Sequence, residues 1–114
     1  MLLNSLLDFR DRVNENVKLK TFLKGWEPVI SISTSDTGEA YSLVVKNETV
    51  TQVLLENMAH NHKIEVEGDE TTLDQVFSGN LNPAEALLDG QLAIYGNEKD
   101  QLKLDAIALI IWGM

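Results

Sequence analysis

The sequence predicts a single α+β domain, in which helices pack on one sheet around a single core. Residues 2–17 repeat apolar side chains at steps of three and four, which is the period of an amphipathic helix. Four later segments alternate apolar and polar side chains, as half-buried strands do. Helical patterns return after Gly68, and 114 residues is the length of one ordinary domain.

The first helix is expected to be interrupted once before it ends. Its apolar positions include Leu2, Leu6 and Val13. The run of Asn14, Glu15 and Asn16 predicts a kink or a break, and Gly25 is expected to stop the helix.

Four strands are expected after this helix. Turn residues at 36–38 and 47–48 separate the first three, which predicts an antiparallel meander. The expected strands cover residues 30–33, 41–45, 50–55 and 63–67.

The second half of the chain begins with a short helix, which Asp69 or Thr71 can cap and which runs through Phe77 to Gly79. A stronger helix start follows at Asn82, because a capping residue precedes a proline at the first helical position.

The end of the chain contains one more strand and one more helix. Gly90 is expected to end the short helix that starts at Asn82, and residues 92–95 then alternate as a fifth strand. Asn97 is expected to cap the last helix.

The charge of the chain argues against several partners. The formal net charge is −9, which disfavours nucleic acids and anionic headgroups. Residues 1–27 carry a net charge of +1 and the remainder carries −10, so the mildly basic first helix is a candidate docking face. We expect no nucleic-acid partner, while a transient membrane contact stays open.

The absence of cysteine excludes disulfides, thiolate nucleophiles and zinc-thiolate sites. The longest uncharged apolar run, residues 106–114, is far shorter than the roughly 20 residues of a membrane span. Together with the absence of a signal-peptide pattern, these features predict a cytoplasmic protein.

No motif for catalysis, metal binding or cofactor binding is found. The glycines match neither a phosphate-binding loop nor a dinucleotide fingerprint. His60 and His62 lie near Glu65 and Glu67, but strand alternation directs His62 and the glutamates to opposite faces. We therefore expect no catalytic residue, no metal site and no cofactor.

The carboxyl-terminal helix is apolar on nearly all sides from residue 106 onward, so nearly all of its sides need cover. Two explanations stay open. Either the first helix or a dimer partner covers the remaining surface, or part of the helix faces a cavity that holds an apolar ligand.

Residues 78–97 resemble the signature of the sterol carrier protein type 2 family. They read SGNLNPAEALLDGQLAIYGN, with a glycine, an Asn-Pro helix start, a second glycine, an alternating strand and a third glycine in register. Trp26 before the first strand and the acidic residues after Gly68 extend the resemblance over most of the chain.

The resemblance implies a five-stranded, mixed and largely antiparallel sheet with helices packed on it, and an apolar tunnel between sheet and helices. Family members bind sterols, fatty acids, acyl-CoA esters or other lipids, and carry them or present them to enzymes. It implies a non-catalytic carrier of an apolar lipid. The residues implied to line the tunnel are Phe77, Leu81, Leu87, Leu88, Leu92, Ile94, Ile107, Ile110, Ile111 and Trp112.

The chain also departs from the animal members of that family. It is acidic where they are basic, and it ends in Trp112-Gly113-Met114 where they carry the peroxisomal tripeptide Ser-Lys-Leu. It resembles a free-standing bacterial-type member, for which fatty acids or other lipids are the safer expectation than sterol.

Two other roles stay open beside the lipid carrier. The same fold with a filled core would serve as a module that dimerises or docks on a partner protein. Alternatively, it would be an accessory domain that presents an apolar substrate to an enzyme. A core without a void larger than a few water molecules would favour the interaction module.

Overall fold

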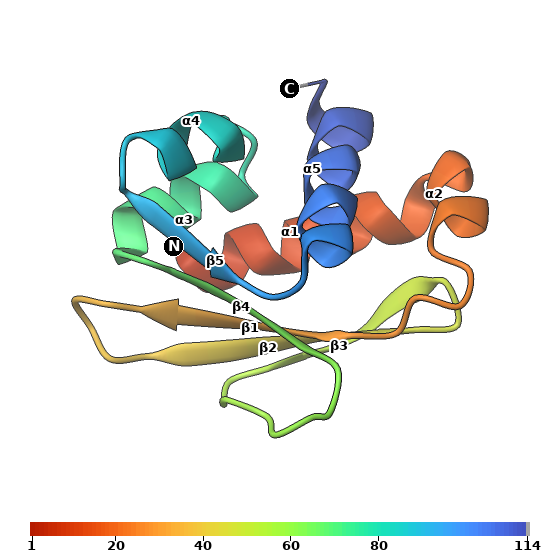
Figure 1. The fold of residues 1–114 in the computed structure, drawn as a ribbon, viewed down its shortest axis with the longest axis horizontal. Helices are drawn as coiled ribbons and strands as arrows, with labels where there is room; N and C mark the ends of the chain where they lie inside the picture. The colour runs from red at the N-terminus through yellow and green to blue at the C-terminus, as the bar shows by residue number, and fades with distance from the viewer. Residues whose placement is uncertain (114) are drawn as a thin grey trace.

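The sheet and its covering helices form two layers in the computed structural model, which describes residues 1–113 (Figure 1). The strands lie in the order β3-β2-β1-β4-β5, and the helices gather on one side of them. The elements in chain order are α1 (Leu2–Glu15), α2 (Val17–Phe22), β1 (Val29–Thr34), β2 (Ala40–Lys46), β3 (Thr49–Leu54), β4 (Lys63–Gly68), α3 (Glu70–Phe77), α4 (Pro83–Leu88), β5 (Leu92–Tyr95) and α5 (Glu98–Trp112).

The register of the sheet confirms the predicted mixed, largely antiparallel arrangement. β1, β2 and β3 form the predicted antiparallel meander. β4 returns beside β1 and runs parallel to it, and β5 pairs antiparallel with β4. Ile30 therefore lies between Leu43 of β2 and Ile64 of β4, in the middle of the sheet.

The predicted interruption of the first helix lies at Asn16. This residue has extended backbone geometry, and its side-chain oxygen accepts a hydrogen bond of 2.9 Å from the Lys18 N–H. The asparagine thereby ends α1 and caps α2, as short polar side chains do at helix starts.

The predicted starts of the three later helices are also confirmed. Asp69, rather than Thr71, caps α3 by accepting from the Thr72 N–H at 2.7 Å. Asn82 and Asn97 cap α4 and α5 in the same way, each with a side-chain oxygen at 2.8 Å from a backbone N–H.

Part of the sheet face opposite the helices is covered by the loop of residues 55–62, which passes beneath β1 and β2 (Figure 1). The Ser31 hydroxyl donates to the Asn57 side chain at 3.1 Å, and the Ser42 hydroxyl donates to the Glu56 carbonyl at 2.7 Å. Both serines are fully buried. The apolar side chains of the main core point instead to the helix-covered face of the sheet.

The core lies between α1 and the helix-facing side of the central strands. Leu6, Ile32, Leu43 and Ile64 are completely shielded from solvent there. None of the helices within the described part of the chain is both long and apolar enough to cross a membrane.

Candidate functional site

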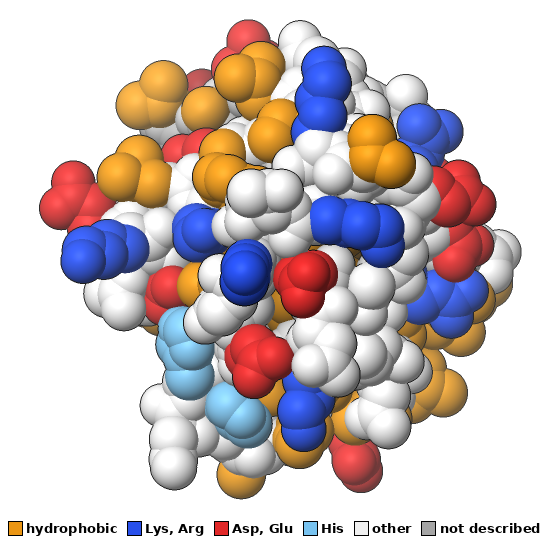
Figure 2. Space-filling model, turned by 90° about the vertical axis from the view of Figure 1, so that its right-hand side faces the viewer, with side chains coloured by type: hydrophobic (Ala, Val, Ile, Leu, Met, Phe, Trp, Pro, Cys, Tyr) orange, Lys and Arg blue, Asp and Glu red, His pale blue; other side chains and the backbone are white. Residues whose placement is uncertain are grey.

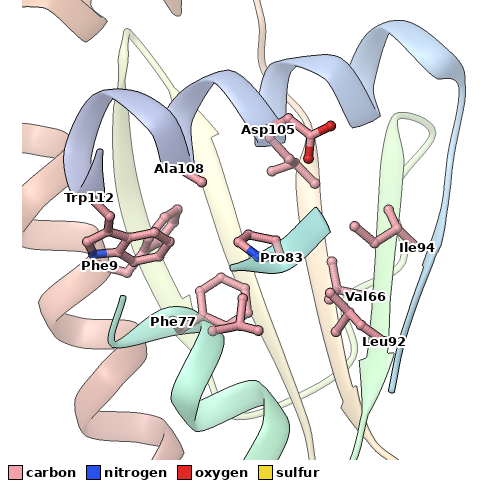
Figure 3. A pocket seen from close by; sticks show the side chains of 11 residues that line it. Phe9, Val66, Phe77, Pro83, Leu92, Ile94, Asp105, Ala108 and Trp112 are labelled. Atoms are coloured by element: carbon pink, nitrogen blue, oxygen red, sulfur yellow. The ribbon is translucent and has the colours of Figure 1, made fainter. Parts of the chain in front are cut away.

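An apolar cavity lies under α5, at the side of the sheet formed by β4 and β5 (Figure 3). Its volume is about 40 Å³, enough for a few water molecules, since one water requires about 10–15 Å³. Eleven residues line it: Phe9, Val66, Val76, Phe77, Pro83, Leu92, Ile94, Leu104, Asp105, Ala108 and Trp112.

Local geometry explains why these side chains converge. Val66 of β4 is directly opposite Ile94 of β5, so both point to the same face of the sheet. On α5, steps of four residues place Leu104, Ala108 and Trp112 on one face, above the strands. The cavity is therefore the space between one sheet edge and one helix face.

Three aromatic rings close one end of the cavity. The Phe9 ring lies 5.2 Å from the Phe77 ring in an edge-to-face arrangement and 5.6 Å from the Trp112 ring, measured between centroids. Such pairs add about 0.5–1.5 kcal/mol beyond the area that they bury. Residues from α1, α3 and α5 thus meet at a single aromatic cluster.

Gly79 packs closely against the Trp112 indole. Its φ of +82° is one that side chains rarely adopt, and a Cβ at this position would lie 2.6 Å from the indole Cδ1. Glycine is therefore required here both by the backbone conformation and by the close approach of the ring.

The Trp112 indole has no polar anchor in the described structure. Its Nε1 is buried, and no hydrogen-bond partner for it is present among residues 1–113. Buried donors are normally paired, and an unpaired one costs about 1–3 kcal/mol. Only apolar contacts hold the ring in place.

A shallow groove outside the cavity runs between the start of α4 and α5. Its volume is about 290 Å³, and its residues are Asn82, Pro83, Ala84, Asp105, Ala106, Ala108 and Leu109. Pro83, Asp105 and Ala108 line both the groove and the cavity. These three residues form the wall between the two spaces.

Asp105 is the one charged residue of the cavity lining. Partial burial raises the pKa of its carboxyl above the ordinary value for aspartate. Desolvation disfavours the charged form of a carboxylate, which gives the shift this direction.

The two halves of α5 are attached differently to the rest of the molecule. In its first half, the buried Asp100 carboxylate accepts from Trp26 Nε1 at 2.8 Å and lies 3.0 Å from His62 Nε2. The Lys103 ammonium donates to the Phe22 carbonyl at 2.7 Å. Beyond Lys103, the described contacts of α5 with other elements are apolar. Polar contacts therefore fix the first half of α5. The second half, which covers the cavity, is held by apolar contacts.

The residues predicted to line a tunnel lie in several environments. Four of them, Phe77, Leu92, Ile94 and Trp112, line the cavity. Leu88 is 87% exposed on the solvent side of α4 and lies away from the cavity. The other five belong to the surrounding core, where Ile107 is buried and Leu81, Leu87, Ile110 and Ile111 are partly buried. Whether any of the ten contacts a ligand stays a prediction.

The sequence interpretation missed seven lining residues, which are Phe9, Val66, Val76, Pro83, Leu104, Asp105 and Ala108. Some of them carried a usable signal. Steps of four back from Trp112 reach Ala108 and Leu104, and Phe9 continues the spacing of Leu2 and Leu6. Nothing in the sequence indicates that Asp105 faces a cavity.

Comparisons with known proteins agree with this architecture. The model of the SCP-2 sterol transfer family matches residues 4–108. The UbiJ-SCP2 ubiquinone synthesis protein has a similar structure, with a TM-score of 0.69 and 17% identity over 88% of this chain and 85% of that one. Palmitated SCP2L2 from Aedes aegypti has a TM-score of 0.60 and 14% identity, over 91% of this chain and 90% of that one.

The same fold also occurs inside a larger enzyme. The chain is similar to part of the sec-alkyl sulfatase PisA1, with a TM-score of 0.63 and 20% identity over 81% of this chain, and it spans only 14% of that enzyme. No curated protein matches the sequence. At these identities the structural likenesses concern the fold, and the family match over residues 4–108 decides membership: the chain belongs to the SCP-2 sterol transfer family.

Proposed function

We propose that this protein binds an apolar lipid in the cavity under α5 and carries it without catalysing a reaction. The observation that carries the proposal is an apolar cavity with ten uncharged lining residues, in a member of the SCP-2 sterol transfer family. A carrier requires an apolar slot and a movable cover, and it requires no nucleophile or catalytic base.

The size of the cavity makes movement part of this proposal. At about 40 Å³ it is much smaller than the roughly 150 Å³ cavity that admits benzene in another protein. A lipid chain therefore requires the second half of α5 to move away from α4 and the sheet. Such a movement would join the cavity to the outer groove, because only Pro83, Asp105 and Ala108 separate them.

Order-of-magnitude energies are compatible with this opening. Removing a 12-carbon chain from water contributes about 0.8 kcal/mol per methylene, or roughly 10 kcal/mol. Uncovering one large side chain such as Trp112 costs about 1.5–3 kcal/mol. The lipid itself can thus drive the opening, and a membrane offers the chain nearly the same gain, so exchange with a membrane is close to balanced.

A matched pair of substitutions on α5 tests the proposal. Leu104→Trp places an indole in the cavity, whereas Leu102→Trp places one at a position that is 60% exposed. With a fluorescent 12-carbon alcohol as probe, we expect the first variant to lose at least about tenfold in affinity, and the second to bind like the wild type. Native mass spectrometry after purification without detergent checks for copurified lipid. Absence of probe binding to the wild-type protein would contradict the proposal.

The interaction module is the second candidate, and two observations favour it. The cavity is only a few water molecules in size, and Leu88, Leu102 and Leu109 are more than half exposed on α4 and α5. Figure 2 shows hydrophobic side chains gathered toward the upper left of one face, with both acidic and basic side chains around them. A mass that rises with concentration in the wild type but not in Leu109→Asp, together with no lipid binding, would favour this function.

A further inference from the structure

We propose that Asp105 selects the head of the lipid, favouring a neutral head that donates a hydrogen bond, such as an alcohol, over a carboxylate. This inference rests on the proposed lipid-binding function and names the class of ligand within it.

The position of Asp105 determines which part of a ligand it meets. Asp105 lines the cavity and the outer groove together with Pro83 and Ala108 (Figure 3). An amphiphile whose chain fills the cavity keeps its polar end toward water, and this wall is where the cavity meets the groove. The ligand head is therefore expected beside the Asp105 carboxylate.

No cation compensates this carboxylate within residues 1–113. The ion pairs formed by the described aspartates and glutamates do not include Asp105, and burial alone accounts for the raised pKa of its carboxyl. Along α5, the residues three and four positions away are all uncharged. They are Gln101, Leu102, Ala108 and Leu109.

The other described side chains that line the groove and the cavity are also uncharged. Across the groove, α4 and its cap present Asn82, Pro83 and Ala84. Across the cavity, the strands and the helices α1 and α3 present only apolar side chains, which are Phe9, Val66, Val76, Phe77, Leu92 and Ile94. Among the described lining residues of the cavity and the groove, a ligand head would therefore meet one negative charge and no other titratable group.

The chemistry of this arrangement separates two classes of lipid. A hydroxyl head can donate a hydrogen bond to the carboxylate, and a bond with one charged partner is stronger than a neutral one. Asp105 is exposed at this wall, and a carboxylate head would place a second negative charge directly beside it, where like charges repel. At neutral pH we expect Asp105 to weaken binding of the acid about tenfold, while leaving the alcohol bound.

The test compares two ligands with the same chain, dodecanol and dodecanoate, at pH 7.5. Each displaces a fluorescent 12-carbon alcohol from the wild-type protein and from Asp105→Asn. In the variant, we expect dodecanoate to bind about tenfold more tightly, and dodecanol to bind no more tightly than it binds the wild type, because the amide oxygen accepts only a neutral hydrogen bond. Asp105→Ser, with folding checked by circular dichroism, replaces the asparagine variant if that one does not fold.

Glu67→Gln is the matched control, because it removes the same charge from the neighbour of a lining residue. Glu67 is exposed on β4 and points to the face of the sheet opposite to Val66. An equal gain for both ligands in Asp105→Asn, or the same gain of dodecanoate in Glu67→Gln, would overturn the role of Asp105 alone. Failure of both ligands to bind any of the proteins would instead overturn the lipid-binding function and this inference with it.

Discussion

The helix-covered face of the sheet has two halves, which are covered in different ways. Over the central strands, α1 covers a closed core in which Leu6, Ile32 and Leu43 are fully buried. Over β4 and β5, α5 covers a cavity whose lining residues Leu104 and Trp112 are only partly buried. We therefore expect the first half to be the more rigid one, and the second half to rearrange at a lower cost in free energy.

The sequences of α1 and α5 explain this difference. α1 has a single apolar stripe, and its buried residues are Leu2, Leu6, Phe9 and Val13. α5 is apolar around most of its circumference, so the sheet covers only part of it and leaves Leu102 and Leu109 exposed. A helix that has no unique buried face is less firmly oriented by burial than a helix that has one.

Equivalent truncations in the two halves should give the largest contrast. Leu43→Ala removes a fully buried side chain from the closed core, and we expect it to lower the free energy of unfolding by about 3 kcal/mol or more. Leu104→Ala only enlarges an existing cavity at a partly buried position, so we expect a loss of about 1–2 kcal/mol. Urea denaturation measures both values, and equal losses would remove the distinction between a rigid and a loose half.

A smaller effect is expected at the contact that holds Trp112. Gly79→Ala introduces both an unfavourable φ and a collision with the indole, for a combined loss of about 2 kcal/mol. In a Trp112→Ala background the collision disappears and only the cost of the φ angle, about 1 kcal/mol, remains. A double-mutant cycle from urea denaturation measures this coupling. The same loss in both backgrounds would mean that the indole does not pack tightly on Gly79.

The order of the elements could be predicted from the sequence because it depends on local signals. Caps such as Asn82 and Asn97, and the interruption at Asn16, act through hydrogen bonds within two or three residues of themselves. The parallel pairing of β4 with β1 is different, because it joins segments about 30 residues apart. It was expected only as part of the family resemblance.

The site was predicted less completely, because a cavity depends on contacts between distant elements. Its aromatic end joins Phe9 to Phe77 and Trp112, which belong to three separate helices. The contact of His62 with Asp100 likewise joins the start of β4 to α5. No local sequence pattern encodes contacts between residues of distant elements. The sequence could indicate which helix had surplus apolar surface, but not which of its residues face a cavity.

The smallest expected effect is that the charges of Asp69 and Asp105 change the free energy of unfolding in opposite directions. The Thr72 N–H stabilises the charged Asp69 carboxylate and lowers its pKa below 3.8, so this contribution is present above pH 3.8 and is lost as pH falls through the lowered value. Burial raises the pKa of Asp105 above 3.8, so its charge destabilises the fold, and this penalty appears as pH rises from 3.8 through the raised value.

At pH 7 we therefore expect Asp69→Asn to be slightly less stable than the wild type and Asp105→Asn slightly more stable, each within about 0.5 kcal/mol. Thermal unfolding between pH 3 and pH 7 measures both, and both differences should shrink as the wild-type carboxylates become protonated. Asp69 caps a helix of the scaffold, whereas the charge of Asp105 is expected to lower the stability of the closed form in the half that we propose to open. A stabilising contribution from the Asp105 charge would mean that a cation approaches it, and the selection against carboxylate lipids would then lose its electrostatic basis.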